Sequence, residues 1–232
     1  MSSSRIASVA SIAAAVAATV TLAPTVTVRA ADDKFVYADF EVPMDQRPVS
    51  KRGGMVQLNA SQEDVQHPAK ARGMDGVDPP APAVKMTSKD GSNHAAVFEY
   101  EFVSPNQWAG VGVEVHGLPD QDGKPQPDDV SGYKNLVLQL YTPDVTNIRV
   151  ELISRGLGMD QQAYPQFTFR TKAGFNTYKV PLNEIAQPQW LETKIDSRKI
   201  LERLTSVSVS AYCDNCRPEK GTIVVDNIVF EK

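Results

Sequence analysis

Four side chains in the middle of the chain could together bind a polyhydroxylated ligand. Arg149 and Glu151 stand two residues apart, and so do Gln139 and Tyr141 in the preceding segment. Residues two apart project from the same face of a β-strand. A guanidinium and a carboxylate can hydrogen-bond neighbouring hydroxyls, while an aromatic ring stacks on the C–H face of a sugar. We therefore expect these four residues to form one ligand-binding face; a cross-strand salt bridge on a solvated sheet is the alternative.

Aromatic residues elsewhere could line the rim of such a face. Trp108 and Tyr164 are the two candidates for ligand contact, and Trp190 and Tyr212 could join them from loops. Ligand sites are typically concave and partly aromatic. Each of these residues could instead anchor the core or a loop, because only 7% of the chain is aromatic.

Two cysteines, Cys213 and Cys216, are the only ones in the chain. In an exported protein this pair predicts a disulfide across a hairpin tip. A thioredoxin-like redox pair would need a helix N-terminus in a βαβ unit, which the surrounding sequence does not offer.

The three histidines are too scattered for a zinc site. Because no nucleophile elbow, HExxH helix or phosphate-binding glycine loop occurs, we expect no enzymatic activity. The alternative is an enzyme in which two carboxylates converge at the ligand site and cleave a glycoside.

Short strands must position these side chains. Apolar residues alternate with polar ones in Asn135 to Tyr141 and again in Asn147 to Ser154, the pattern of half-buried strands. Thr142-Pro143-Asp144 between them has turn chemistry. We expect the two segments to pair as an antiparallel hairpin.

The rest of the chain repeats this pattern in about eight to ten short strands. One short helix is expected near its end, with Ser197 as N-cap and with Ile200, Leu201 and Leu204 on its buried face. The predicted fold is therefore all-β, a two-sheet antiparallel jelly-roll β-sandwich with one short helix.

The domain organisation predicted from the sequence has two parts. Residues 1–30 carry Arg5, an Ala-rich apolar run and a small-residue cleavage pattern before Ala31, which indicates a secretory signal peptide. An uncleaved membrane anchor is the alternative reading of that run. Residues 31–232 form a single domain, in which 43–94 is a long loop excursion over the sheets with a strand only at Met55 to Leu58.

Composition and net charge limit the kinds of partner that the protein can bind. The chain is 41% hydrophobic and 22% charged, as in ordinary globular domains. Removal of residues 1–30 leaves 22 basic and 28 acidic residues, a net charge of −6. Such an acidic domain is a poor nucleic-acid binder. We expect a secreted or periplasmic protein without membrane attachment after cleavage.

Five short motifs follow one another along the chain. They are Asp39-Phe40-Glu41, Gly53-Gly54, Trp108-Ala109-Gly110, Asp129-Val130-Ser131-Gly132-Tyr133 and Gly221-Thr222-Ile223-Val224-Val225-Asp226-Asn227-Ile228. This ordered set resembles the galactose-binding-like jelly rolls. Within that group the chain is most similar to the family 11 carbohydrate-binding modules and to the complex I intermediate-associated protein 30 domains. The resemblance covers nearly all of residues 31–232.

This resemblance implies a ligand groove on the concave sheet face and a structural calcium ion (Ca²⁺) where the first and last strands meet. Carried onto this sequence, the calcium ligands would be Asp39 or Glu41 and Asp226. Calcium binds several oxygen atoms, so carboxylates from both ends of the chain would hold those ends together. In the alternative, Asp39 and Glu41 are ordinary outward strand residues and Asp226 caps a bulge.

The expected function is that of an exported, non-catalytic carbohydrate-binding module that recognises a polysaccharide or oligosaccharide. A protein-binding or assembly module of the intermediate-associated-protein type is the alternative, and it would use the same sheet or the long loop to bind a protein partner.

Overall fold

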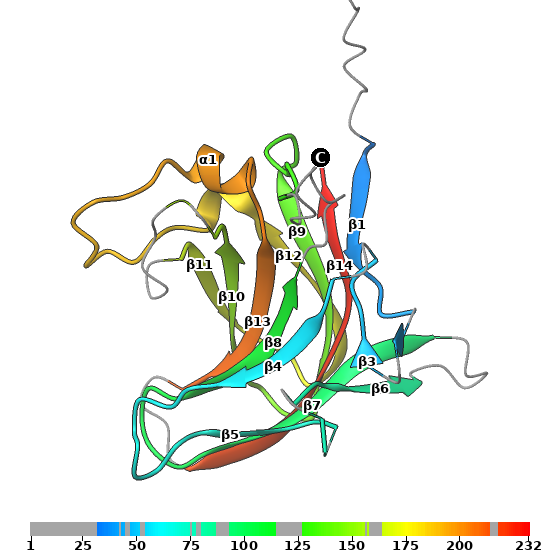
Figure 1. The fold of residues 1–232 in the computed structure, drawn as a ribbon, viewed down its shortest axis with the longest axis vertical. Coiled ribbons are helices and arrows are strands. Elements are labelled where there is room, and N and C mark those ends of the chain that lie inside the picture. The colour runs from blue at the N-terminus through cyan, green and yellow to red at the C-terminus, as the bar shows by residue number, and fades with distance from the viewer. Residues whose placement is uncertain are drawn as a thin grey trace, which may run out of the picture. The chain divides into compact units, whose positions relative to one another are not determined.

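Two antiparallel sheets stacked on a shared core make up the body of the protein (Figure 1). The structure is a computed structural model. It describes residues 32–41, 43–44, 47–51, 54–74, 76–77, 80–86, 93–114, 127–155, 157, 164–213 and 218–232. The predicted signal peptide at 1–30 lies outside these residues. Within the described part of the chain, no helix has the length and apolar character needed to cross a bilayer.

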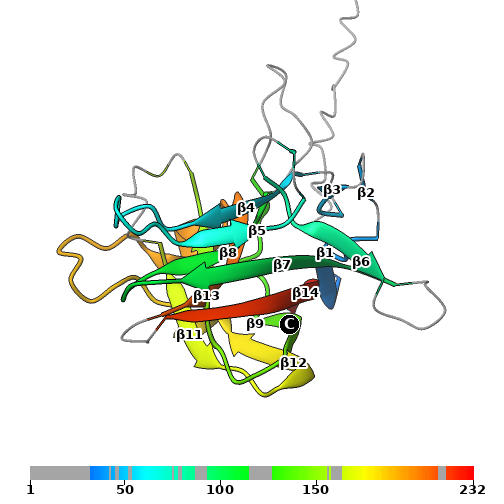
Figure 2. The same ribbon diagram turned by 90° about the horizontal axis from the view of Figure 1, so that it is seen from below.

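The larger sheet has seven strands, ordered β12-β9-β14-β7-β5, with β1 also beside β14 and β6 also beside β7. Figure 2 shows β5, β7 and β14 running side by side. Strand β1 pairs with the end of β14, so the two ends of the described chain lie on neighbouring strands. The strands are β1 (Lys34–Ala38), β5 (Lys70–Arg72), β6 (Ala83–Met86), β7 (His94–Phe102), β9 (Asn135–Thr142), β12 (Gly174–Pro181) and β14 (Glu219–Glu231).

Five strands form the second sheet, in the order β11-β10-β13-β8-β4. They are β4 (Val56–Ala60), β8 (Trp108–Glu114), β10 (Asn147–Ile153), β11 (Gln166–Arg170) and β13 (Ser206–Tyr212). Outside the two sheets are a two-stranded ribbon, a 3₁₀ turn and one α-helix: β2 (Pro43–Met44), β3 (Arg47–Pro48), η2 (Leu182–Glu184) and α1 (Ser197–Leu201). The all-β, two-sheet sandwich with one short helix is confirmed.

Alternation of apolar side chains explains the core between the sheets. In β9 every second residue is buried, and β10 shows the same pattern. Their inward side chains, among them Leu138 and Val150, belong to one continuous cluster. A second group is aromatic: the Phe230 ring centroid lies 5.8 Å from that of Tyr37 and 6.3 Å from that of Phe35.

The predicted hairpin of β9 with β10 is wrong. Strand β9 pairs with β12 and β14, whereas β10 pairs with β11 and β13 in the other sheet. The turn between them therefore crosses from one sheet to the other. A buried hydroxyl network holds the crossing, because Thr142 Oγ1 lies 2.8 Å from Thr171 Oγ1, which also accepts a hydrogen bond from the Thr146 N–H.

The excursion at 43–94 contains more regular structure than the single strand predicted for it. Strand β4 completes one edge of the five-stranded sheet by pairing with β8. Strands β5 and β6 both pair with β7 along the edge of the other sheet. Strand β4 corresponds to the predicted strand at Met55 to Leu58. Loop-like composition hid β5 and β6, since they are only three and four residues long.

Helix α1 is present where it was expected, but its cap differs. Asp196 is the N-cap, and its Oδ1 accepts a hydrogen bond of 2.9 Å from the Arg198 N–H. The predicted N-cap, Ser197, is instead the first helical residue. Ile200 and Leu204 are buried as expected, and Leu201 packs partly buried against the core.

Candidate functional site

A groove of about 900 Å³ crosses the outer face of the five-stranded sheet. Its floor is made by residues that alternate with the core-cluster residues of β8, β10 and β13, so it faces away from the core. Loops at both ends add aromatic and polar side chains. The residues that line it include Gln57, Asn59, Glu63, Asn106, Trp108, Gly112, Glu114, Arg149, Glu151, Arg155, Tyr164, Gln166, Trp190, Ser206, Ser208 and Tyr212.

Arg149 lies between two aromatic rings on this floor. Trp108 and Tyr212 stand opposite each other on β8 and β13. The guanidinium carbon of Arg149 lies 5.6 Å from the Trp108 ring centroid and 5.0 Å from that of Tyr212. Both distances are within the range of a cation–π interaction. The rings therefore hold the guanidinium in place before any ligand arrives.

Glu151 is the acidic partner of Arg149. Arg149 Nε lies 3.5 Å from Glu151 Oε1, which is an ion pair, but Nε is buried and makes no hydrogen bond within the described residues. Burial raises the pKa of the Glu151 carboxyl, although the charge of Arg149 and a hydrogen bond with Ser208 oppose that shift. The pair thus places a donor and an acceptor side by side on the groove floor.

The raised pKa of Glu151 leads to a test by pH. A carboxyl whose pKa is higher in the folded than in the unfolded state stabilises the fold while it is protonated, and that contribution is lost as pH rises through the folded pKa. As pH rises above the ordinary Glu pKa of about 4.3, we expect the melting temperature of Glu151→Gln to rise relative to that of the native protein. Calorimetry at a series of pH values from acid to neutral measures it, with exposed Glu192→Gln as control. Parallel curves for Glu151→Gln and the native protein would contradict it.

Two glycines of β8, Gly110 and Gly112, lie on the groove side of the five-stranded sheet, where there is little space for a larger side chain. A Cβ added at Gly110 would lie 2.4 Å from the Ser210 Cα, so no larger residue fits there without moving β13. Gly112 on the same strand lines the groove, and a Cβ at that position would already lie 3.5 Å from the Asn59 amide nitrogen. Glycine at Gly112 leaves the backbone open to a ligand, as its alternation with valines suggests.

Charges along the groove are nearly balanced. Arg155 Nη2 lies 2.9 Å from Glu114 Oε1 at one end, which repeats the pairing of Arg149 with Glu151 in the middle. Glu63 adds one further carboxylate at the opposite end. A groove with paired charges and four aromatic residues suits an uncharged polar ligand better than a polyanion.

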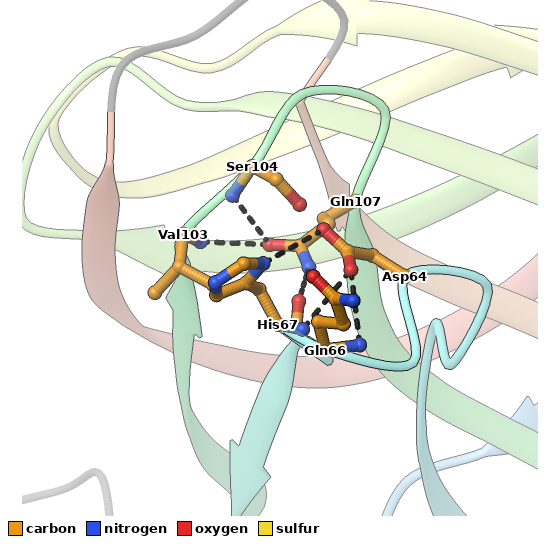
Figure 3. Close-up of polar contacts among 6 residues, drawn as sticks. All are labelled: Asp64, Gln66, His67, Val103, Ser104 and Gln107. Atoms are coloured by element: carbon orange, nitrogen blue, oxygen red, sulfur yellow. Dashed lines mark hydrogen bonds and ion pairs between the residues drawn. The ribbon is translucent and has the colours of Figure 1, made fainter.

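The side chain of Gln107 holds together two turns next to Trp108, which lines the groove. Figure 3 shows the contacts of Gln107 with these turns. Its buried amide oxygen accepts hydrogen bonds of 2.7 Å from the Val103 N–H and 3.1 Å from the Ser104 N–H. Its Nε2 donates a hydrogen bond of 2.6 Å to the His67 carbonyl. One side chain therefore ties together two turns, and these turns carry Glu63 and Asn106 into the groove wall.

The turn at 61–69 is also ordered by its own side chains. Asp64 Oδ1 accepts hydrogen bonds from the backbone N–H groups of Gln66 and His67, and Asp64 Oδ2 lies 3.5 Å from His67 Nδ1 (Figure 3). The hydrogen bond from the His67 N–H contributes most to lowering the pKa of the exposed Asp64 carboxyl. Ser61 completes the link, because its Oγ accepts a hydrogen bond of 3.1 Å from the Trp108 N–H.

Of the six residues predicted to contact ligand, four line the groove and two do not. Arg149 and Glu151 form its centre, and Trp108 and Tyr164 line it as well. The expectation that Gln139 and Tyr141 share this face is wrong, because they belong to β9 in the other sheet. Alternation within each strand predicted which residues face outward, but it does not reveal which sheet a strand joins.

Sequence reasoning missed the contribution of β4 to the groove. Gln57 and Asn59 line the groove from this strand, while Val56 and Leu58 point into the core. That alternation is visible in the sequence and could have identified both polar residues. Ser206 and Ser208 line the groove from β13, but small hydroxyl residues that alternate with valines give no sign of a binding floor in the sequence.

The three predicted calcium ligands each have partners within the protein. Asp39 Oδ2 lies 3.0 Å from Lys51 Nζ, and Glu41 Oε2 lies 3.2 Å from His94 Nδ1. Asp226 is buried at the bulge of β14, where it accepts hydrogen bonds of 3.1 Å from Asn93 Nδ2 and 2.8 Å from the Asn227 N–H. Burial raises its pKa, and these two hydrogen bonds oppose that shift. No set of three or more His, Cys, Asp or Glu among the described residues is arranged to hold a metal ion. Calcium binding stays a prediction.

The predicted disulfide involves one described residue. Cys213 is buried at the end of β13, and its backbone N–H donates a hydrogen bond of 2.9 Å to the Gln107 carbonyl. Cys216 lies outside the described residues, so the pairing stays a prediction.

Comparisons with known proteins agree with this architecture. No protein-family model and no curated protein matches the sequence. A family 11 carbohydrate-binding module from Clostridium thermocellum, solved in complex with a β-1,3-1,4-mixed-linked tetrasaccharide, is 12% identical with a TM-score of 0.52 over 85% of this chain and 95% of that one. The fold is similar to that of family 11 carbohydrate-binding modules.

A second solved structure supports the same conclusion. The family 11 module of a cellulosomal cellulase of Clostridium thermocellum is 13% identical, with a TM-score of 0.52 over 87% of this chain and 96% of that one. At such low identity the likeness concerns the fold alone. It confirms the jelly-roll resemblance that the ordered motifs predicted.

Proposed function

We propose that this protein is an exported, non-catalytic domain that binds a neutral carbohydrate chain in the groove of the five-stranded sheet. One observation supports the proposal most directly: Arg149 is fixed between Trp108 and Tyr212 beside Glu151, on the floor of a groove of about 900 Å³. Donor, acceptor and aromatic surfaces are then all presented together, as recognition of sugar hydroxyls and C–H faces requires.

The likeness of fold favours the same function without identifying the ligand. One of the similar modules was solved with a β-1,3-1,4-mixed-linked tetrasaccharide. We therefore take soluble mixed-linkage β-glucan as the first probe and galactan as the second. Because no nucleophile, catalytic metal set or cofactor motif was recognised in the sequence, we propose that the protein binds its ligand without cleaving it.

Trp190 provides a test with little risk to folding. Its side chain lines the groove but is 62% exposed, so Trp190→Ala removes aromatic contact area without opening a core cavity. We expect about tenfold weaker binding to mixed-linkage β-glucan, the effect of losing roughly 1.4 kcal/mol. Affinity electrophoresis measures it, with Val145→Ala, a change at another exposed apolar residue, as the matched control.

The same gels are run with calcium and with a chelator. Asp226 belongs to β14 of the seven-stranded sheet, whereas the groove lies on the five-stranded sheet. We therefore expect a calcium ion held by Asp39, Glu41 and Asp226 to change thermal stability more than affinity. Unchanged migration of the folded native protein with every glycan tested would overturn the carbohydrate proposal and favour a protein partner.

A further inference from the structure

The outer face of the seven-stranded sheet carries an apolar row that the groove does not use. Each member stands directly opposite the next on the neighbouring strand, so the row crosses five strands in a line. Neighbouring strands lie about 4.8 Å apart, so the row is roughly 19 Å long. Its members, from β12 across to β6, are Phe175, Tyr141, Val224, Val97 and Ala83.

Two aromatic rings dominate one end of this row. The ring centroids of Tyr141 and Phe175 lie 5.2 Å apart with an angle of 42° between the ring planes. Phe175 is 52% exposed on β12, the strand at the edge of the sheet. Both rings lie outside the core cluster, to which β9 contributes Leu136, Leu138 and Leu140. We call this pair and its neighbours the Tyr141–Phe175 surface.

Two polar, uncharged side chains lie next to the rings, and the carboxylate of Asp226 stands opposite one of them, Gln139, on β14. Thr177 stands opposite Gln139 in the adjacent row and is exposed. Asn227 Nδ2 donates a hydrogen bond of 3.2 Å to Gln139 Oε1, which fixes the orientation of that amide. A rigid aromatic platform bordered by hydroxyl and amide groups offers the same combination of contacts that favours a sugar in the groove.

A hollow of about 660 Å³ lies beyond Val224 on the same sheet. Thr222 lines it and stands two residues before Val224 on β14, so its side chain projects from the face of the apolar row. Figure 2 shows the three strands that form it, β5, β7 and β14, lying side by side. The charged residues that line the hollow change sign from one strand to the next, and Lys70 of β5 forms an ion pair of 3.3 Å with Glu101 of β7.

We propose that the Tyr141–Phe175 surface is a second carbohydrate-binding site, which takes a neutral glycan chain across the sheet from Phe175 towards the hollow at Thr222. A neutral glycan fits because the two rings offer a surface for stacking on the C–H face of a sugar, while Thr177 and Gln139 beside them offer hydroxyl and amide groups. This proposal extends the function proposed above, but it does not depend on the groove being a binding site.

The two sites lie on opposite sides of the protein. Each occupies the outer face of its own sheet, and the core separates the two sheets. A single domain with both sites can therefore hold two glycan chains at once. A protein molecule that binds one chain at each site links the two chains together and so cross-links the polysaccharide.

Light scattering of soluble mixed-linkage β-glucan titrated with protein tests this proposal. We expect the native protein to increase scattering by cross-linking chains, and Phe175→Ala to remove at least nine-tenths of that increase. Retention of Phe175→Ala in affinity electrophoresis should fall by less than threefold, since the groove is intact. Val145→Ala is the matched control, because its side chain is equally exposed but lies in the turn after β9.

Other outcomes separate this proposal from that for the groove. If Trp190→Ala leaves retention unchanged while Phe175→Ala abolishes it, the groove proposal falls and the Tyr141–Phe175 surface stands. If the Phe175→Ala protein increases light scattering as much as the native protein does, the proposal of a second site is overturned. Sedimentation velocity without glycan gives a further check: a native dimer that Phe175→Ala dissociates would make this face a self-association interface and would also overturn the proposal.

Discussion

Replacement of Arg149 with methionine is expected to weaken glycan binding by at least tenfold, or about 1.4 kcal/mol. Methionine keeps an apolar chain between Trp108 and Tyr212 but removes every donor of the guanidinium. The side chain of Arg149 is only 16% exposed, so the protein has already desolvated the charge that the ligand would meet. Preorganised, partly buried arginines of this kind are common among residues that dominate binding energy.

The single change also leaves Glu151 buried without its cation. Loss of one partner of a buried ion pair typically costs about 3–5 kcal/mol of stability, and the partial exposure of this pair reduces that figure. We therefore add Arg149→Met/Glu151→Gln, which removes both charges and should recover most of the stability. If this folded double variant binds mixed-linkage β-glucan as tightly as the native protein, neither charged group contacts the glycan. Arg155→Met, at the exposed end of the groove, serves as the charge-matched control.

The largest effect on stability is expected from Phe230→Ala, at about 3–5 kcal/mol. Phe230 is fully buried on β14, and its ring lies against those of Phe35 and Tyr37 on β1 and that of Tyr133. Removal of this ring opens a cavity between the first and last strands. Urea denaturation at constant m-value measures the loss.

Phe175→Ala is the control for that experiment, because Phe175 is an exposed phenylalanine on the same sheet. Its loss should change the free energy of unfolding by less than about 1 kcal/mol. A Phe230→Ala protein within 1 kcal/mol of the native one would show that the aromatic cluster does not hold β1 to β14.

Strand patterns in the sequence were sufficient to predict the architecture. Strands β9 and β10 match their predicted segments to within one residue, because a half-buried strand must alternate polar and apolar residues. Their pairing was not predictable in the same way. A four-residue connection such as the one between Thr142 and Asn147 can close a hairpin or pass between sheets, and only the packing of the whole core decides between these possibilities.

The candidate site was predictable in part for the same reason. Arg149 and Glu151 needed only the local rule that residues two apart share a face, and both line the groove. Gln139 and Tyr141 obey the same rule but lie on the opposite side, because their strand belongs to the other sheet. The contribution of Gln57 depended on β4, whose place at the sheet edge is set by a long-range pairing with β8.

The pairing of β1 with the end of β14 makes the protein a candidate for circular permutation. Lys34 lies opposite Glu231, and the Lys232 N–H donates a hydrogen bond of 3.1 Å to the Asp33 carbonyl, so a short peptide could join residues 33 and 232. New chain ends opened at the exposed Pro143–Asp144 turn would interrupt no strand of either sheet. The groove could then be linked to a carrier from the opposite end of the sandwich, with its lining residues unchanged.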